Sequence, residues 1–258
     1  MANLEALLFD VDGTLADTER DGHRAAFNAA FDEAGLDWTW DEALYGRLLA
    51  VTGGKERIRY YLERFNTDFS RPDRFDGFVA GLHRSKTAHY TRMLAEGAIP
   101  LRTGVRRLLD ESREAGLRLA IATTTTPANV TALLRSGLGD QGESWFEVIA
   151  AGDIVPEKKP APDIYLWAME QMALRPDQCL GLEDSHNGVQ SVLRAGIRAL
   201  VVTVNGYTRG EDLSGATLVV DHLGEADNPC AALTGDLGGC GMIDVGLLRT
   251  VHHRANGG

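Results

Sequence analysis

Two patterns of hydrophobic positions divide this chain. Residues 4–10, LEALLFD, form a short apolar run that ends in an acidic residue, as expected for a buried strand that opens into a turn. From Thr18 to about Leu94, apolar residues recur at helical spacing, for example in HRAAFNAAFDEAG and KERIRYYLERF, and no strand-like run interrupts them. The pattern therefore predicts one strand followed by a helical block.

After Pro100, helical segments alternate with short runs rich in β-branched residues. Helices of about 10–15 residues between such runs are typical of a parallel, doubly wound sheet with right-handed crossovers. The predicted strands are residues 117–123, 146–151, 179–184 and 198–204. The fold class is therefore α/β of the Rossmann-like type.

The helical block is then an insertion between the first strand and the rest of the sheet. We expect an α/β core formed by residues 1–16 and 96–258 and a small all-helical cap formed by residues 17–95. Trp38 and Trp40 are expected in the apolar core of the cap.

The glycine-rich tail after about Pro229 is expected to be loosely packed. His252 and His253 lie in this tail, and we expect no catalytic role for them.

Composition narrows the possible partners. The 258 residues are 44% hydrophobic, and the formal net charge of −11 disfavours nucleic acid, which is bound by clustered Lys and Arg. No apolar run approaches the roughly 18–20 residues that cross a bilayer, and the first strand starts too early for a signal peptide. Three cysteines without CxxC spacing indicate free thiols. We expect a cytoplasmic monomer with no membrane partner.

Polar residues follow four predicted strands, where open parallel sheets bind their ligands. Each is common in turns by itself, but four such segments at one sheet edge point to a site. They are Asp10–Thr14, Thr123–Thr126, Glu157–Pro160 and Glu183–Asp184.

Asp10 and Asp12 are two positions apart, so their side chains point the same way on extended backbone. Two carboxylates so close repel each other unless a cation lies between them. Oxygen ligands suit Mg²⁺, and Asp184, with or without Glu183, could complete the shell.

Four segments together resemble the signature motifs of the haloacid-dehalogenase-like hydrolases. They are FDVDGTLAD at residues 9–17, the strand that ends at Thr123, KKPAPDIY at residues 158–165, and LEDSHNGV at residues 182–189. Their order is that of the family, and the helical insertion matches the subgroup with a small helical cap.

The resemblance implies a phosphatase in which Asp10 is the nucleophile and Asp12 the general acid and base. Thr123 and Lys159 would hold and neutralise the phosphoryl group. The implied metal ligands are Asp10, Asp12, Asp184 and Glu183. The implied substrate-binding residues are Asp17, His23, Gly53, Gly54, Lys55, Arg57, Thr124, Thr125 and Lys158.

TGGKER at residues 52–57 is not a P-loop, because the upstream glycine and the Ser/Thr after Lys are missing. It is either a helix start with solvated charges or a site for a second phosphate. Together with the other motifs it looks similar to CbbY-type proteins, which dephosphorylate xylulose 1,5-bisphosphate, an inhibitor of Rubisco. Asp17 departs from the longer Glu expected there, and the segment from Glu19 to Gly22 is one residue longer than expected before His23.

His23 could face the substrate or be a structural residue. Two other enzyme activities are compatible with the same motifs: that of a sugar phosphomutase of the β-phosphoglucomutase type and that of a broad sugar-phosphate phosphatase. A non-catalytic binding protein on the same fold is the third alternative, and the intact Asp10, Asp12, Lys159 and Asp184 argue against it.

Overall fold

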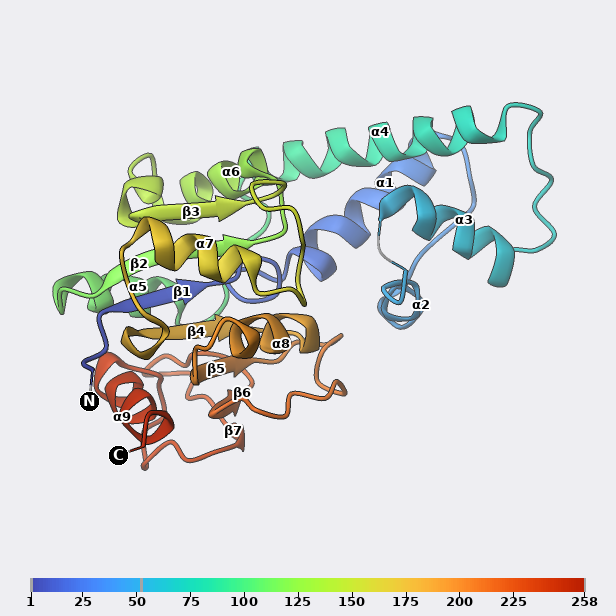
Figure 1. Cartoon of the computed structure of the whole chain (residues 1–258). Helices are drawn as coiled ribbons and strands as arrows, with labels where there is room; N and C mark the ends of the chain where they lie inside the picture. The colour runs from blue at the N-terminus through green and yellow to red at the C-terminus, as the bar shows by residue number, and fades with distance from the viewer. Residues whose placement is uncertain (1, 52, 258) are drawn as a thin grey trace. The chain divides into compact units, whose positions relative to one another are not determined.

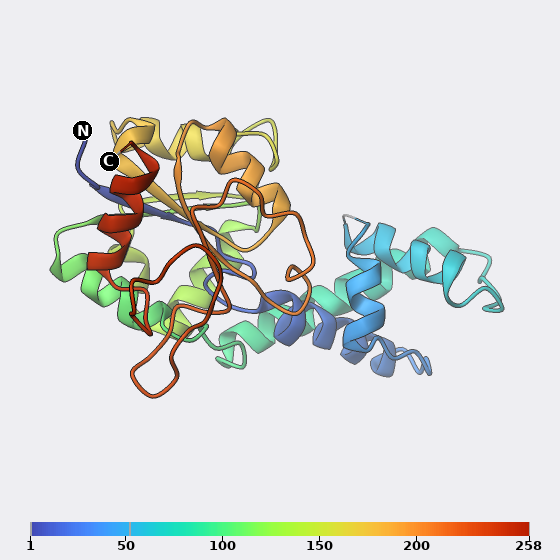
Figure 2. The ribbon, with the colours of Figure 1, turned by 90° about the horizontal axis from the view of Figure 1, so that it is seen from below.

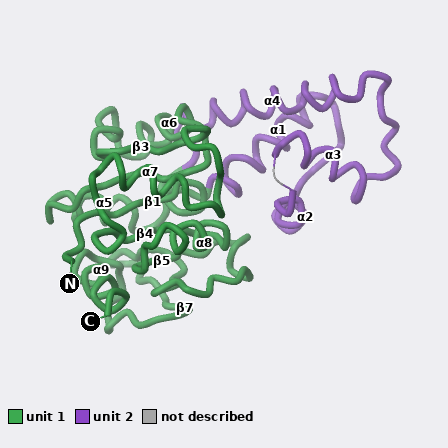
Figure 3. The backbone as a smooth tube through the Cα atoms, in the orientation of Figure 1, with its two compact units in different colours: residues 1–17, 100–258 green, residues 18–99 purple. Residues whose placement is uncertain are grey.

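The computed structural model describes residues 2–51 and 53–257 and divides the chain into two compact units (Figure 3). The core unit comprises Met1–Asp17 and Pro100–Gly258, and the helical unit comprises Thr18–Ile99. The cap predicted from the sequence was residues 17–95.

The core unit is built on a seven-stranded sheet in the order β3-β2-β1-β4-β5-β6-β7 (Figure 1). Every neighbouring pair is parallel except β6 and β7. The α/β fold class predicted from the alternating pattern is confirmed. The strands are β1 (Ala6–Phe9), β2 (Arg118–Thr123), β3 (Val148–Ala151), β4 (Cys179–Glu183), β5 (Ala199–Thr203), β6 (Leu218–Val220) and β7 (Ala232–Thr234).

The strand β1 lies inside the sheet, between β2 and β4, and its end determines where the site lies along the strands. Phe9 is in register with Ile121 of β2 and Leu182 of β4. Because parallel strands end at one edge, the residues that follow these three positions become neighbours.

Helices cover both faces of this sheet, and Figure 2 shows α7 and α8 together on one side and α5 on the other. An apolar cluster that includes Leu8, Tyr165 and Val192 fills the space under α7 and α8. The core helices are α5 (Val105–Glu114), α6 (Pro127–Leu138), α7 (Asp163–Gln171), α8 (His186–Arg194) and α9 (Val245–Ala255), with short 3₁₀ turns η2 (Gly142–Trp145) and η3 (Pro176–Gln178).

The end of the C-terminal segment is packed, so the prediction of a loose tail was wrong for α9, whereas residues 231–240 are mostly exposed. The side chain of Asp244 caps α9 by accepting a hydrogen bond from the Leu247 amide at 2.7 Å. Leu248 and Val251 are buried, and α9 contacts α5, β4 and β5. His252 is also buried, with Nε2 2.9 Å from the Asp177 carbonyl oxygen, which is a structural position.

The helical unit begins with an irregular turn and continues with regular helices (Figure 1). The hydrogen bonds of a π-helix close loops that are one residue longer than those of an α-helix, so a π-helix accommodates an inserted residue. The π-helix includes His23 and the preceding segment, Glu19 to Gly22, which was longer than expected. The elements are η1 (Thr18–Arg24, π-helical), α1 (Ala25–Glu33), α2 (Glu42–Leu48), α3 (Gly54–Arg64) and α4 (Phe75–Ala95).

Aromatic side chains form the core of the helical unit. Trp40 is fully buried, and its ring centroid lies 4.6 Å from that of Phe27 and 4.9 Å from that of Phe31. Trp38 is also buried, so the prediction for both tryptophans is confirmed. Large buried aromatic surfaces stabilise a unit that has few residues to form a core.

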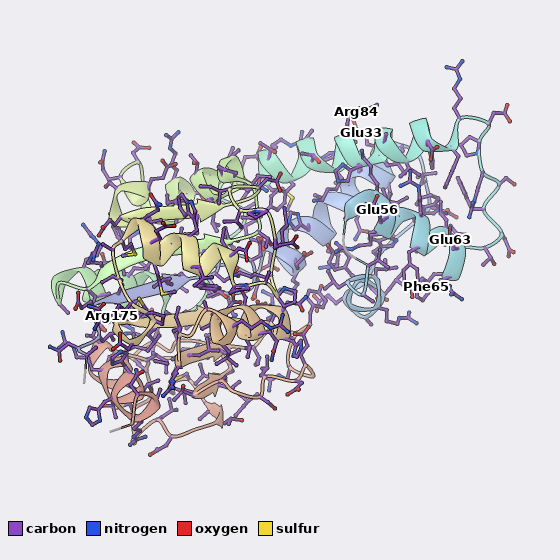
Figure 4. All side chains as sticks on the ribbon, viewed as in Figure 1. Glu33, Glu56, Glu63, Phe65, Arg84 and Arg175 are labelled. Carbon is purple, nitrogen blue, oxygen red and sulfur yellow. The ribbon has the colours of Figure 1, made fainter. Side chains whose placement is uncertain are left out.

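Polar contacts hold α1 against α4 at the surface of the helical unit. Glu33, at the end of α1, lies beside α4 (Figure 4) and accepts hydrogen bonds from Ser85 and from His89, the latter at 2.9 Å. Within the described residues, no helix is long and apolar enough to span a membrane.

Candidate active site

Asp10 directly follows β1 and is buried at the edge of the sheet. Its amide donates to the Leu182 carbonyl oxygen at 2.9 Å, which continues the pairing of β1 with β4. The chain then turns at Gly13, which has a φ of +86° and donates to the Ala16 carbonyl oxygen at 2.7 Å. A Cβ atom at Gly13 would lie 2.0 Å from Asp184 Oδ2, so only glycine fits.

Lys159 joins two buried carboxylates. Its Nζ lies 2.7 Å from Asp10 Oδ1 and 2.6 Å from Glu183 Oε1, and the Tyr165 hydroxyl donates to the same Glu183 oxygen at 2.6 Å. Burial lowers the pKa of Lys159, but the charges of Asp10 and Glu183 and their hydrogen bonds outweigh burial and raise it overall. Lys159 is therefore a permanent cation that fixes the direction of the Asp10 carboxylate.

Three buried carboxylates, those of Asp10, Glu183 and Asp184, offer oxygen atoms within 4.8 Å of one another. Burial raises the pKa of Asp184, and the charges of Asp10 and Glu183 raise it further. Burial also raises the pKa of Glu183, while Lys159 opposes the shift. Such an excess of buried negative charge is relieved by a divalent cation, and an all-oxygen donor set fits Mg²⁺.

Asn205 orients the third carboxylate of this cluster. It lies just beyond β5, and its Nδ2 donates to Asp184 Oδ2 at 2.8 Å. Its own Oδ1 accepts from the Tyr207 amide at 2.9 Å, which fixes the amide group. Asp184 is thereby held in one orientation.

The polar loop after β2 contains three of the predicted residues. Thr123 ends the strand and is buried, and its Oγ1 accepts a hydrogen bond from the Thr125 amide at 3.3 Å. Thr124 is exposed. Because β2 is the direct neighbour of β1, this loop lies at the same sheet edge as Asp10.

Two other predicted residues of the core unit take part in ion pairs. Asp17 Oδ1 lies 3.4 Å from Arg102 Nε. Lys158 Nζ lies 2.7 Å from Asp153 Oδ1, and the Lys158 side chain is half exposed. Lys159 contacts the carboxylate cluster, whereas the adjacent Lys158 pairs with Asp153 outside it.

His23 lies inside the helical unit beside Lys86. Lys86 Nζ is 2.7 Å from His23 Nδ1, and the His23 ring stacks on Tyr90 with centroids 4.0 Å apart. Burial lowers the pKa of His23 to about 3, and the nearby Lys86 adds to the shift, although Glu19 opposes it. His23 is therefore neutral, and because Lys86 donates to Nδ1, its proton is on Nε2.

The glycine-rich segment of the helical unit forms the start of α3. Gly53, with a φ of +95°, is the N-cap residue and, as a glycine, offers no side chain to cap the helix. Gly54 packs so closely on His83 that an added Cβ would lie 2.5 Å from its ring, and Lys55 is exposed. Helix amides next to a lysine provide a setting for an anion. Thr52 lies outside the described residues.

Arg57, predicted to bind substrate, points into the helical unit. Its Nη1 donates to the Tyr45 hydroxyl at 2.8 Å, and the same nitrogen lies 3.7 Å from Glu19 Oε2. The Tyr45 hydroxyl in turn donates to Glu19 at 2.5 Å. The structure thus separates Arg57, which is buried, from Lys55, which is exposed two positions earlier.

Comparison with known proteins places these motifs in a family. The model of the haloacid dehalogenase-like hydrolases matches residues 4–196, a stretch that covers all four strand-end motifs. The chain belongs to the haloacid dehalogenase-like hydrolase family. The predicted membership, and with it the prediction of a phosphoric monoester hydrolase, is confirmed.

Several relatives in this hydrolase family match nearly the whole chain. The plasmid-encoded CbbY protein of Cupriavidus necator is 44% identical over 252 residues, which is 97% of each chain. A crystal structure of a CbbY variant from Rhodobacter sphaeroides in complex with xylulose-(1,5)bisphosphate is 45% identical, has a TM-score of 0.72, and aligns with 85% of this chain and 94% of that one. A putative β-phosphoglucomutase from Thermotoga maritima is 28% identical, has a TM-score of 0.68, and aligns over 84% and 94% of the two chains.

Three residues that contact the predicted site residues escaped the sequence analysis. Asn205 follows a strand end, so the rule that located Asp10 and Asp184 could have found it. Tyr165 has the spacing of a buried helical residue, which hides the use of its hydroxyl. Lys86 lies in the middle of a long helix, where no local signal distinguishes it from a surface lysine.

Proposed function

We propose that this hydrolase is a Mg²⁺-dependent phosphatase of small sugar phosphates and that its preferred substrate is xylulose 1,5-bisphosphate. The observation that carries the proposal is the position of Asp10, a buried carboxylate held by Lys159 within an acidic cluster at the end of the interior strand β1. The sequence similarity to CbbY, with one relative crystallised with this bisphosphate, supports the choice of substrate.

Asp10, Asp184 and the backbone of Asp12 would hold the Mg²⁺, with Glu183 next to them. The ion supplies positive charge to the carboxylates and to the phosphoryl oxygens. Glu183 Oε1 already accepts from Lys159 and Tyr165, so we assign Glu183 chiefly to holding Lys159.

In the proposed first step, an Asp10 carboxylate oxygen attacks phosphorus and the phosphorus–oxygen bond to the sugar breaks. The sugar oxygen leaves with the electron pair and takes a proton from the Asp12 carboxyl group. In the second step, the Asp12 carboxylate takes a proton from water, the water oxygen attacks phosphorus, and Asp10 and inorganic phosphate are released. Lys159 and the amides of the Thr123–Thr125 loop stabilise the phosphoryl charge.

The residues at the start of α3 support the proposal that the substrate carries two phosphates. The core motifs recognise only the transferred phosphoryl group, so a second phosphate needs a second cationic site. Lys55, together with the Gly53 and Gly54 amides at a helix end without a side-chain cap, has the chemistry for one. Arg57 is less suited, because its guanidinium group is engaged by Tyr45 and Glu19.

The test is phosphate release from a pentulose 1,5-bisphosphate and from the matching monophosphate, with Asp10→Asn as the inactive control. We expect kcat/KM to favour the bisphosphate by about 100-fold, the equivalent of one or two charge-assisted hydrogen bonds. Lys55→Ala should remove most of this preference and spare small aryl phosphates. Arg64→Ala, which removes an exposed cation at the other end of α3, is the matched control.

Equal rates for the two substrates would rule out the bisphosphatase and favour a broad sugar-phosphate phosphatase. A sugar phosphomutase is the second candidate, because of the similarity to the putative β-phosphoglucomutase. It would return an isomeric sugar phosphate in place of inorganic phosphate, which chromatography of the products distinguishes.

A further inference from the structure

Arg102 is a partly buried cation of the core unit that hydrogen-bonds to several segments of the chain. It lies between the end of the helical insertion and α5, and only 9% of its side chain is exposed. Its amide donates to the Leu15 carbonyl oxygen at 2.8 Å, which places the side chain behind the turn that follows Asp10.

The guanidinium group of Arg102 binds the ends of three strands. Nη1 donates to the Gly13 carbonyl oxygen after β1 and to the carbonyl oxygen and Oγ1 of Thr203, at 3.1 and 3.0 Å, at the end of β5. Nη2 donates to the carbonyl oxygens of Val204 at 2.6 Å and Asp221 at 2.8 Å, the latter just after β6. A planar guanidinium group, with its five N–H donors in fixed directions, can donate to all these acceptors at once, whereas the three donors of a lysine ammonium group cannot.

Two of these contacts lead directly to the acidic cluster. The Gly13 carbonyl group belongs to the turn that carries Asp12, and the Gly13 α-carbon packs against Asp184 so closely that no Cβ is possible. Val204 immediately precedes Asn205, whose amide holds Asp184 Oδ2 at 2.8 Å. One guanidinium group therefore links the turn after the nucleophile to the segment that orients Asp184.

We propose that Arg102 is a positioning residue that sets the spacing between the Asp10–Asp12 turn and Asp184, and thereby the affinity of the cluster for Mg²⁺. The proposal rests on the proposed function only in taking Asp10 and Asp184 as the groups that hold the ion. Groups that orient metal ligands typically change metal affinity by about 10–100-fold when they are removed.

Arg107, on α5, provides a matched control. Its Nη2 donates to the carbonyl oxygens of Leu223, Gly224 and Ile243 at 3.0, 2.9 and 3.2 Å, so it too connects separate segments through backbone carbonyls. None of its described hydrogen bonds reaches Gly13 or Val204. Arg102→Met and Arg107→Met thus remove comparable numbers of bonds to backbone carbonyls, and only the first touches the site.

The experiment is calorimetric titration of Mg²⁺ into the resting full-length protein, together with turnover of p-nitrophenyl phosphate at saturating Mg²⁺. We expect Arg102→Met to weaken Mg²⁺ binding by about tenfold or more and to lower kcat by about tenfold or more. Arg102→Lys, which keeps the charge and loses the fork, should lose most of the same affinity. Arg107→Met should stay within about twofold of wild type in both measurements.

Mg²⁺ affinity and kcat within twofold of wild type in Arg102→Met would overturn the proposal, as would equal losses in Arg107→Met. If Arg102→Met does not fold, by circular dichroism, Arg102→Lys decides by the same thresholds. A wild-type protein that binds Mg²⁺ but releases no phosphate would contradict the proposed function alone, and the titration would still decide the role of Arg102.

Discussion

At the scale of single residues, the three buried carboxylates of the site outnumber the cations that contact them. Lys159 contacts Asp10 and Glu183, while Asp184 is held by the neutral amide of Asn205. A buried carboxylate that loses its partner typically costs several kcal/mol, so these contacts couple the stability of the sheet edge to its chemistry. The same imbalance makes a divalent cation the natural completion of the site.

The proposed role of Asp12 as general acid can be tested with substrates that differ in their leaving groups. In Asp12→Ala, phosphoryl transfer to Asp10 from a sugar phosphate should fall by about 100-fold or more, because the alkoxide needs a proton. Transfer from p-nitrophenyl phosphate should fall by about tenfold or less, because p-nitrophenolate leaves without one. Single-turnover rates of aspartyl-phosphate formation measure both, and equal losses with the two substrates would show that Asp12 is not the general acid.

The sequence predicts residues that lie at strand ends better than residues that reach the site from elsewhere. Asp10, Glu183 and Asp184 were predicted because hydrophobic runs locate strand ends, whereas Lys159, which lies in the loop beyond β3, was chosen by the family resemblance. The structure does bring these four together. The hydroxyl of Tyr165 was not predicted, because it reaches the cluster from the buried face of α7, and hydrophobic spacing identifies only that face. Their catalytic roles stay predictions.

At the scale of secondary structure, the clearest error concerns α9. Glycines before residue 242 suggested a loose tail, but the helix that follows has apolar residues on one face and an Asp N-cap, and both signals are local. The π-helix that contains His23 could not be predicted by spacing, because apolar periodicity assumes 3.6 residues per turn.

The packing of α9 leads to a stability prediction. Leu248 is fully buried, so Leu248→Ala should lower the free energy of unfolding by about 2–4 kcal/mol through lost burial and a residual cavity. Arg249→Ala, its exposed neighbour on the same helix, should change it by less than about 0.5 kcal/mol. Urea unfolding followed by circular dichroism measures both variants. Equal midpoints for Leu248→Ala and wild type would mean that α9 unfolds apart from the sheet.

At the scale of the whole molecule, the chain leaves the core unit and re-enters it at the same place, and the helical unit is inserted there. Ala16 pairs with Leu101 in an antiparallel bridge, and the Arg102 amide donates to the Leu15 carbonyl oxygen at 2.8 Å. The two ends of the insertion are therefore held together by the core unit itself. Because these ends are close together, we expect a linker of about four Gly and Ser residues to be long enough to replace residues 18–99.

We expect the core unit with this linker to fold and to hydrolyse p-nitrophenyl phosphate in a Mg²⁺-dependent reaction, because Asp10, Lys159 and Asp184 all belong to it. Its preference for a pentulose bisphosphate over the monophosphate should fall from about 100-fold to less than about threefold, because Lys55 and the start of α3 are gone. The kcat/KM ratio of the two substrates measures this, and the same excised protein with Asp10→Asn corrects for contaminating phosphatases. A preference that survives excision would place recognition of the second phosphate in the core unit and remove the role of Lys55.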